Sequence, residues 1–477
     1  MVSANTQQRN HNEHRFSLSM LVFFDNSAAC CYTVCAFPPP MNTENEIPCK
    51  SHSHGLWILS PLLVFFLLYV TTSIVVGDFY KMPVTVAFMA ACTWAFIVCR
   101  PRRFNERIER FSRGAAHSNI MMMVWIFVLA GAFAQSAKYI GSVDATVNLT
   151  LSLLPANMVL AGVFLAACII SLSIGTSVGT IVALMPVAVG LADKAGADLS
   201  LMAGGVIGGA FFGDNLSFIS DTTIAATRTQ GCAMQDKFKA NFAIVLPAAL
   251  VTLCIYVVLG WSLAPVSVPS GTEWLKVLPY LLVLGTALCG MNVMKVLILG
   301  LLSTGAVVVM DNHYSLMDWA GAMGQGMTGM GELIIVTLLA AGMLELIRYN
   351  GGLTYIITHL TACIRGRRGA EACIGLMAAL ANFCTANNTV AIVAVGNIAR
   401  SVAQKYGISA PRAASLLDTF SCIVQGILPY GAQLLMGSAL AGITAFAIIP
   451  HLFYPFAMGI SAFIFIIFGL AGGKNKS

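Results

Sequence analysis

The sequence predicts an all-α polytopic membrane protein with about 10–13 transmembrane helices, two structural repeats and broken or re-entrant helices. Of its 477 residues, 58% are hydrophobic and 10% are charged, whereas a soluble domain carries about 25% charged residues. Apolar stretches at 56–76, 242–261 and 445–472 reach the roughly 20 residues that cross a bilayer core. Shorter, glycine-rich apolar segments gather in two zones, 170–231 and 371–442.

Residues 1–54 form a polar N-terminal extension that differs from the rest of the chain. Its stretch 1–40 is a poor secretory signal, because Asp25 interrupts a short apolar run and no clear cleavage site follows. We expect translation to start at Met41, with an extension beginning at Met1 as the alternative. The fold prediction therefore leaves residues 1–40 out.

Residues 55–472 form the predicted transmembrane domain. Polar residues, glycine and proline divide it into apolar segments that we expect to be helical. These segments fall at about 56–76, 82–98, 119–140, 155–174, 178–193, 200–213, 238–263, 276–290, 292–310, 331–348, 371–386, 388–404, 411–428 and 443–471.

The formal net charge of +6 is concentrated in arginine-rich stretches between apolar segments. Residues 99–119 hold six arginines, and residues 365–369 form a second cluster. We expect both to be short loops, and such positive loops indicate the cytoplasmic side of a membrane and not a nucleic-acid partner. The stretch 141–154 has no Lys or Arg and fits the opposite side. Two crossings precede the first basic loop, which predicts a cytoplasmic N-terminus in a multi-pass protein of the inner cell membrane.

The two zones of short segments can be aligned, which predicts two structural repeats with cores at about 155–263 and 371–471. Each zone runs from small polar residues through an apolar segment to a Lys-x-Gly, at 194–196 and 405–407. From there an offset of 211 residues places Asp214 opposite Gln425. Glycine-interrupted apolar segments in corresponding positions of two halves indicate the binding site of a secondary transporter.

The stretch "SLSIGTSVGT" (171–180) suits a broken helix better than a lipid-facing one. Gly175 and Gly179 allow a break at membrane depth, where freed carbonyls and neighbouring hydroxyls can coordinate a cation. The alternative is a seam of small residues at which two helices pack closely.

The stretch "GGAFFGDNLSFISDTT" (208–223) places two acids in an apolar chain. An ionisable residue at membrane depth costs at least about 2.5–3.5 kcal/mol on insertion scales and is a functional candidate. If the segment is helical, Asp214, Ser217 and Asp221 share one face. Carboxylate and hydroxyl oxygens suit Na⁺ or protons and not soft metals, and one carboxylate can hold either. The alternative is a surface loop, since Arg228, Lys237 and Lys239 indicate an aqueous boundary just downstream.

In the second zone, "ANFCTANNTVA" carries a cluster of neutral polar residues between apolar flanks. Their amides could bind a cation through carbonyl oxygen or a substrate carboxylate through NH₂, and a simple turn between two helices is the alternative. Gln425 and Gln433 flank "GILPYG", a predicted helix break. The candidate neutral ligands are Asn382, Asn387, Asn388, Thr389 and Gln425.

Other charges inside apolar segments are Lys295, Glu332, Glu345 and Asp418. We interpret all four as structural, with Glu332 as a helix cap and Glu345 as a helix end beside Arg348. Glu332 and Glu345 are also candidates for a proton path.

The sequence does not favour an enzyme or a resident cofactor. A Walker loop and a metalloprotease HExxH motif are absent from the sequence, and the 14 cysteines are scattered without metal-ligand spacing.

"GTSVGT" and "GGAFFGDNLSFISDTT", followed by "RAASLLDTFSCIVQGILPYGAQ" (412–433), resemble the NhaC-type Na⁺/H⁺ antiporter family of the wider ion-transporter superfamily. The resemblance covers about 55–470 and implies Na⁺/H⁺ exchange, two repeats and discontinuous helices around a midplane site. Carried over residue by residue, it implies a cation and proton site formed by Thr176, Ser177, Thr180, Asp214, Ser217, Ser220, Asp221, Thr222 and Thr223, with Na⁺ at Asp214 and Asp221.

The sequence departs from the family pattern at three positions. Phe218 stands where the family usually has Pro, while Val178 and Tyr430 stand where Trp is usual. Because family relatives also exchange organic acids or amino acids, a Na⁺- or H⁺-coupled transporter of such solutes is the alternative to a Na⁺/H⁺ antiporter. The expected partners are the lipid bilayer, Na⁺ and H⁺, and a homo-oligomer is compatible with the sequence.

Overall fold

The protein is helical throughout the part that the computed structural model describes, which is residues 55–76, 83–100, 103–218, 220–263, 273–311, 313–362 and 364–469. No β-strand occurs in these ranges, and the predicted all-α class is confirmed. The extension 1–54, with the predicted start at Met41, lies outside the described residues.

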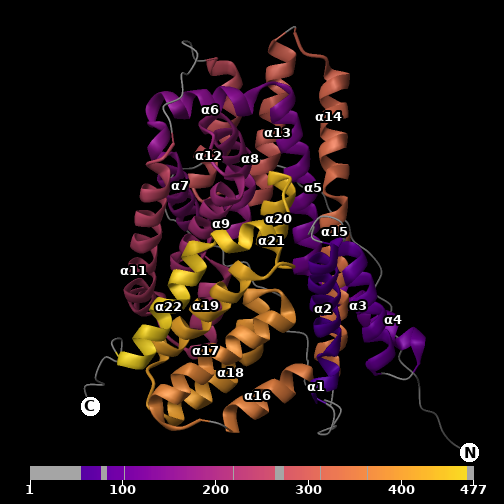
Figure 1. Ribbon diagram of the computed structural model, residues 1–477, viewed down its shortest axis with the longest axis vertical. Helices are drawn as coiled ribbons and strands as arrows, with labels where there is room; N and C mark the ends of the chain where they lie inside the picture. The colour runs from indigo at the N-terminus through magenta and orange to yellow at the C-terminus, as the bar shows by residue number, and fades with distance from the viewer. Residues whose placement is uncertain are drawn as a thin grey trace, which may run out of the picture. The chain divides into compact units, whose positions relative to one another are not determined.

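Along the chain, a group of connecting helices precedes the helices of each predicted repeat (Figure 1). Before the first zone lie α1 (Gly55–Ile58), α2 (Ser60–Val76), α3 (Val84–Val98), α4 (Phe104–Ala115), α5 (Ser118–Tyr139), α6 (Ser142–Leu153) and η1 (Ala156–Met158). The first zone and its exit contain α7 (Val159–Ile174), α8 (Ser177–Ala195), α9 (Leu199–Leu216), α10 (Asp221–Gln230) and α11 (Met234–Gly260).

The second half of the chain begins with connecting helices that lead into the second zone. These are α12 (Trp274–Leu288), α13 (Val293–Met310), α14 (Leu316–Gly329), α15 (Gly331–Tyr349) and α16 (Gly352–Ala362). The second zone and its exit contain α17 (Gly366–Thr385), α18 (Asn388–Lys405), α19 (Ala410–Ile427), α20 (Ala432–Ala441), α21 (Ala445–Ile448), η2 (Ile449–His451) and α22 (Phe453–Phe468).

Many of these helices can cross a membrane. In the described ranges, seven spans are long and apolar enough by length and composition, and eight if α21–η2 and α22 count as one span bent by 51°. The apolar helices α3 and α12 are shorter. The chain is therefore a multi-pass membrane protein, while the total of about 10–13 crossings stays a prediction.

Three predicted segments differ from the observed helices. The arginine-rich stretch 99–119 is not a loop, because its residues 104–115 form the amphipathic helix α4, which packs on α15. The stretch 141–154 is likewise a helix, α6, which starts after Gly141 at φ 71°. The apolar stretch 443–471 is broken near Leu452 and is not one continuous helix.

The two zones contain helix breaks at matching positions. The helix α7 ends at Gly175 with φ 73°, and α17 ends at Ala386 with φ 49°. Ala386 is the one described non-glycine residue in the left-handed region, a conformation that costs an L-residue about 1–2 kcal/mol. A second break separates α9 from α10, and a matching break separates α19 from α20.

The helix boundaries in the two zones share one offset. Helix α19 begins and ends 211 residues after α9, and α20 begins and ends 211 residues after α10. Individual hydrogen bonds follow the same offset: Ser171 Oγ donates to the Ala210 carbonyl at 2.5 Å, and Asn382 Nδ2 donates to the Ser421 carbonyl at 2.7 Å.

The packing of the two zones is also reciprocal. Helix α20 packs against α8, and its counterpart α10 packs against α18, the counterpart of α8. Helices α9 and α19 pack against each other. When element i of one half contacts element j of the other and j contacts i, the two halves are related by an approximate two-fold axis.

Glycines bring α9 against α7. A Cβ at Gly209 would lie 2.5 Å from the Phe164 carbonyl oxygen, and a Cβ at Gly213 would lie 2.4 Å from the Leu172 nitrogen. Backbones this close leave no room for a larger residue, so this face fixes the position of the last turn of α9, which carries Asp214.

Candidate functional site

Asp214 is held between two helix breaks. It lies in the last turn of α9 and is 5% exposed. Ser177 Oγ donates to its Oδ2 at 2.7 Å, and Ser220 Oγ donates to its Oδ1 at 2.6 Å. Ser177 is the first residue of α8, and Ser220 is the N-cap of α10. Both helices therefore direct their positive N-terminal ends toward the carboxylate.

In the part of the chain that the structure describes, Asp214 has no cationic side chain as a partner. Within the described ranges it takes part in no ion pair, whereas the buried acids Asp418 and Glu371 pair with Lys237 and Arg412. An uncompensated buried charge costs several kcal/mol. A proton or a small cation at the carboxylate would remove this cost.

A chain of amides links this carboxylate to the second zone. Gln433 Nε2, on α20, donates to Ser177 Oγ at 2.9 Å. Gln425 Nε2, on α19, donates to Gln433 Oε1 at 2.9 Å and to the Ala386 carbonyl at 3.1 Å. The structure thus connects Gln425 to Asp214 through Gln433 and Ser177, although Gln425 and Asp214 lie on different halves.

The other predicted neutral ligands lie around the second break. Asn388 Nδ2 is 3.7 Å from Cys422 Sγ, and Asn387 Oδ1 accepts from the Val390 N–H at 3.0 Å as a helix cap. Thr389 is half-buried. In the described part of the chain, Asn382 Oδ1 and Gln425 Oε1 are buried without a hydrogen-bond partner. Their amide nitrogens are engaged while these two oxygens are not.

The predicted shared helical face of Asp214, Ser217 and Asp221 is wrong, because α9 ends at Leu216 and α10 begins at Asp221. Ser217 is buried and donates to the Leu172 carbonyl at 2.9 Å. Asp221 is exposed at the start of α10. The break redirects the chain, so a spacing of seven residues does not align the two acids.

The remaining hydroxyl candidates also lie at the breaks. Thr222 Oγ1 is 2.9 Å from Ser220 Oγ, and Thr180 Oγ1 donates to the Thr176 carbonyl at 3.1 Å. Thr223 Oγ1 accepts from Lys237 Nζ at 2.8 Å.

Lys237 does not mark an aqueous boundary, contrary to the sequence prediction. It is 1% exposed and forms an ion pair with Asp418, which is 0% exposed. Sequence reasoning missed this pair because the two residues lie on α11 and α19, far apart in the chain. The sequence gives one indication of such a pair: Lys237 lies in a helix whose later residues are almost all apolar.

The proton-path candidates lie elsewhere. Glu332 is in the first turn of α15, and Glu345 pairs with Arg348 at 2.8 Å, as the helix-end interpretation predicts. In the described ranges neither residue has a hydrogen bond to Asp214, Ser177 or Ser220. The proton path stays a prediction.

Ser177 also lies in a G-x-S-x-G pattern, Gly175–Gly179, the form of a hydrolase nucleophile elbow. That motif requires a strand before the turn, whereas here the helix α7 precedes it. The partners of Ser177 Oγ in the described structure are Asp214 and Gln433, not a histidine base. The described residues also contain no cluster of three or more His, Cys, Asp or Glu suited to a metal ion.

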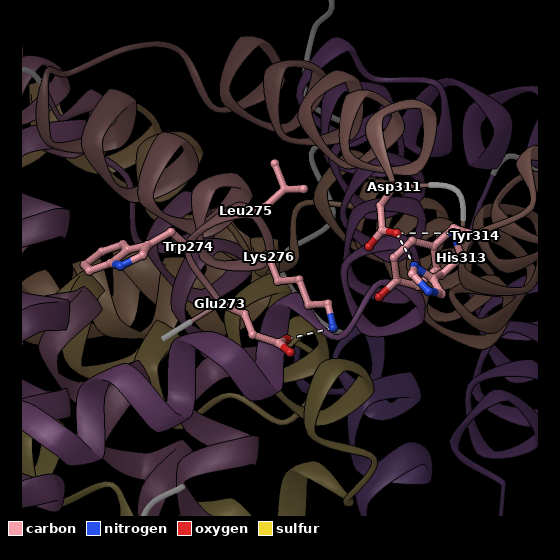
Figure 2. Close-up of a pocket in the computed structure, with 7 residues that line it drawn as sticks. All are labelled: Glu273, Trp274, Leu275, Lys276, Asp311, His313 and Tyr314. Atoms are coloured by element: carbon pink, nitrogen blue, oxygen red, sulfur yellow. Dashed lines mark hydrogen bonds and ion pairs between the residues drawn. The ribbon is translucent and has the colours of Figure 1, made fainter. Parts of the chain in front are cut away.

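A pocket of about 470 Å³ lies at the start of α12 and the end of α13 (Figure 2). It contains a Lys276–Glu273 pair at 2.7 Å and an Asp311–His313 pair at 2.6 Å. The hydrogen bond from His313 lowers the pKa of the Asp311 carboxyl. This pocket contains none of the predicted site residues.

The many membrane-spanning helices and the uncompensated acid between paired helix breaks define a secondary transporter. The sequence profile of the Na⁺/H⁺ antiporter family matches residues 50–261 and 274–473. The chain belongs to this family, and the predicted family resemblance is confirmed.

Curated relatives agree with this assignment. The chain is 24% identical over 388 residues to the Na⁺/H⁺ antiporter NhaC of Bacillus subtilis, covering 73% of this chain and 83% of that protein. It is 22% identical over 392 residues to NhaC of Alkalihalophilus pseudofirmus, covering 74% and 83%. It is 20% identical over 429 residues to the malate-2H⁺/Na⁺-lactate antiporter of Bacillus subtilis, covering 83% and 90%.

Proposed function

We propose that this antiporter exchanges Na⁺ for protons at the Asp214 carboxylate. The observation that carries the proposal is a buried acid that accepts hydrogen bonds from Ser177 and Ser220 and has no ion-pair partner in the described ranges. A proton or Na⁺ neutralises the same carboxylate, so binding of one excludes the other. This competition is the chemical basis of exchange.

The oxygen atoms around Asp214 support Na⁺ as the ion that competes with the proton. The hydroxyls of Ser177, Ser220 and Thr222 are hard oxygen donors next to the carboxylate. The unpartnered oxygens of Asn382 and Gln425 lie at the second break. Because the NH₂ groups of both side chains are already engaged, a substrate carboxylate would find few free donors there.

The reciprocal packing of the two zones supports alternating access by two repeats. The breaks at Gly175 and Ala386, and those after α9 and α19, leave short helices that contact the opposite half. A shift of one repeat against the other would expose Asp214 first to one side and then to the other. Exposed Asp221, which follows the break after α9, would attract cations toward the site.

The proposal is tested by Na⁺-dependent pH changes in everted vesicles. Asp214→Asn should abolish exchange because it removes the group for which Na⁺ and the proton compete. Asp221→Asn should keep the maximal rate but require more Na⁺. The control is Asp236→Asn, which removes an exposed acid from the first turn of α11 and should exchange like the wild type. Full exchange by Asp214→Asn would refute the proposal.

The alternative substrate class is an organic acid or amino acid. The malate-2H⁺/Na⁺-lactate antiporter among the relatives favours it. A panel of labelled organic acids and amino acids in proteoliposomes separates the two functions. We expect no counterflow of any labelled acid and a Na⁺-dependent proton flux; saturable counterflow would favour the alternative.

We further propose that the protein lies in the inner cell membrane with α4 and residues 365–369 on the cytoplasmic side. The concentration of arginines in these stretches supports this orientation.

A further inference from the structure

Lys237 and Asp418 form a buried group that the proposed exchange does not use. Their side chains are 1% and 0% exposed. Besides its ion pair, the Lys237 ammonium donates to the Asn215 backbone carbonyl at 2.6 Å and to Thr223 Oγ1 at 2.8 Å. An ammonium has three protons, and these three oxygens accept all of them.

The three acceptors come from different helices. Asn215 lies in the last turn of α9 and Thr223 in the first turn of α10, on the two sides of one break, whereas Asp418 lies on α19 of the other half. Asn241, one turn after Lys237 on α11, donates to the same Asn215 carbonyl at 3.0 Å. The oxygens are therefore positioned by the fold and by Asn241 as well as by the lysine.

A carboxylate, a backbone carbonyl and a hydroxyl form an oxygen donor set of the kind that hard cations bind. We propose that Asp418, Asn215 and Thr223 form a second monovalent-cation site, which the Lys237 ammonium fills as a tethered cation. It differs from the Asp214 site, since neither Ser177 nor Ser220 takes part in it.

The geometry also sets the class of cation. The nitrogen–oxygen separations of 2.6 and 2.8 Å match ammonium, and K⁺ is close to ammonium in size. The site without its lysine should therefore take K⁺, NH₄⁺ and methylammonium more readily than the smaller Na⁺. In the intact chain, Lys237 keeps Na⁺ away from Asp418 and leaves Asp214 as the acid open to it, a consequence that rests on the proposed function.

The test is cation-dependent thermal unfolding of purified Lys237→Ala in detergent. Potassium, ammonium, methylammonium and sodium chlorides are titrated separately, with choline chloride holding the ionic strength constant because choline is too large for the site. We expect a saturable rise in unfolding temperature of about 2–4 °C with K⁺, NH₄⁺ and methylammonium. The smaller rise with Na⁺ is measured in Lys237→Ala with Asp214→Asn, because Na⁺ also binds at Asp214 in the proposed exchange.

Matched variants separate a cation site from a general salt effect. The wild type, Lys237→Ala with Asp418→Asn, and Lys194→Ala should all lack the rise with K⁺, NH₄⁺ and methylammonium, although Na⁺ can still stabilise each of them at Asp214; Lys194 pairs with Asp144 at 3.3 Å and is partly exposed. Lys237→Ala with Asp214→Asn should keep it, which makes the result independent of exchange at Asp214.

Equal responses of Lys237→Ala and its double variant with Asp418→Asn would overturn the proposal, because the carboxylate would then hold no cation. The same titration is repeated with Lys237→Gln, whose side chain fills more of the space that the lysine leaves. If both single variants stay unfolded in every cation tested, the lysine is a structural lock and the proposal fails.

Discussion

At the scale of the residue, Asp214 and Asp418 show how neighbours decide what a buried acid does. Asp418 has the Lys237 ammonium beside it, whereas the donors to Asp214 among the described residues are the hydroxyls of Ser177 and Ser220. Hydroxyls stabilise a carboxylate but bring no compensating charge. In the proposed exchange, Asp214 is therefore the acid that is open to an exchangeable cation, and Asp418 is not.

Removing one hydroxyl should weaken this site measurably. A hydrogen bond to a charged group contributes about 1.5–3 kcal/mol, so Ser220→Ala should weaken apparent Na⁺ affinity at least about tenfold. The Na⁺ concentration for half-maximal exchange in vesicles measures the effect. Ser173→Ala removes a hydroxyl that bonds only its own helix in the described structure, and it should leave the value unchanged. Equal values for both variants would exclude Ser220 from the site.

At the scale of the element, the α7–α9 contact holds the acid in place. Gly213 directly precedes Asp214, and a Cβ there would lie 2.3 Å from Ser171 Cβ. Glycines therefore have two uses here: along α9 they allow close packing against α7, and at Gly175, with φ 73°, one ends α7 as the sequence predicts.

Gly213→Ala should therefore push α9 away from α7. Overpacking of a close contact costs typically about 1–3 kcal/mol, and the unfolding temperature of the purified protein should fall. Gly285→Ala is the matched control, because a Cβ on this α12 glycine would meet no atom within 4 Å. A Gly213→Ala protein as stable as Gly285→Ala would contradict the proposed constraint.

At the scale of the whole molecule, the proposed orientation can be tested with two single cysteines. Glu106 is on α4 and Asp144 is on α6, and both are exposed. In a cysteine-free background, we expect a membrane-impermeant thiol reagent to label Asp144→Cys from the outside of intact cells and Glu106→Cys only in everted vesicles. The reverse labelling pattern would show that the protein has the opposite orientation in the membrane.

The sequence by itself determined the membrane class, the helical fold and the positions of the two broken zones. These follow from apolar length, glycine placement and the cost of a charge at membrane depth, which are all local properties. The offset of 211 residues, read from Lys-x-Gly positions, also coincides with the boundaries of α9 and α19.

Only the tertiary structure decided which polar groups meet. The break after Leu216 separates Asp214 from Asp221, and packing of α11 against α19 places Lys237 on Asp418. Gln433 reaches Ser177 because α20 packs on α8. Such contacts join residues distant in the chain, and the direction of a helix after a break depends on what it packs against, which local sequence does not encode.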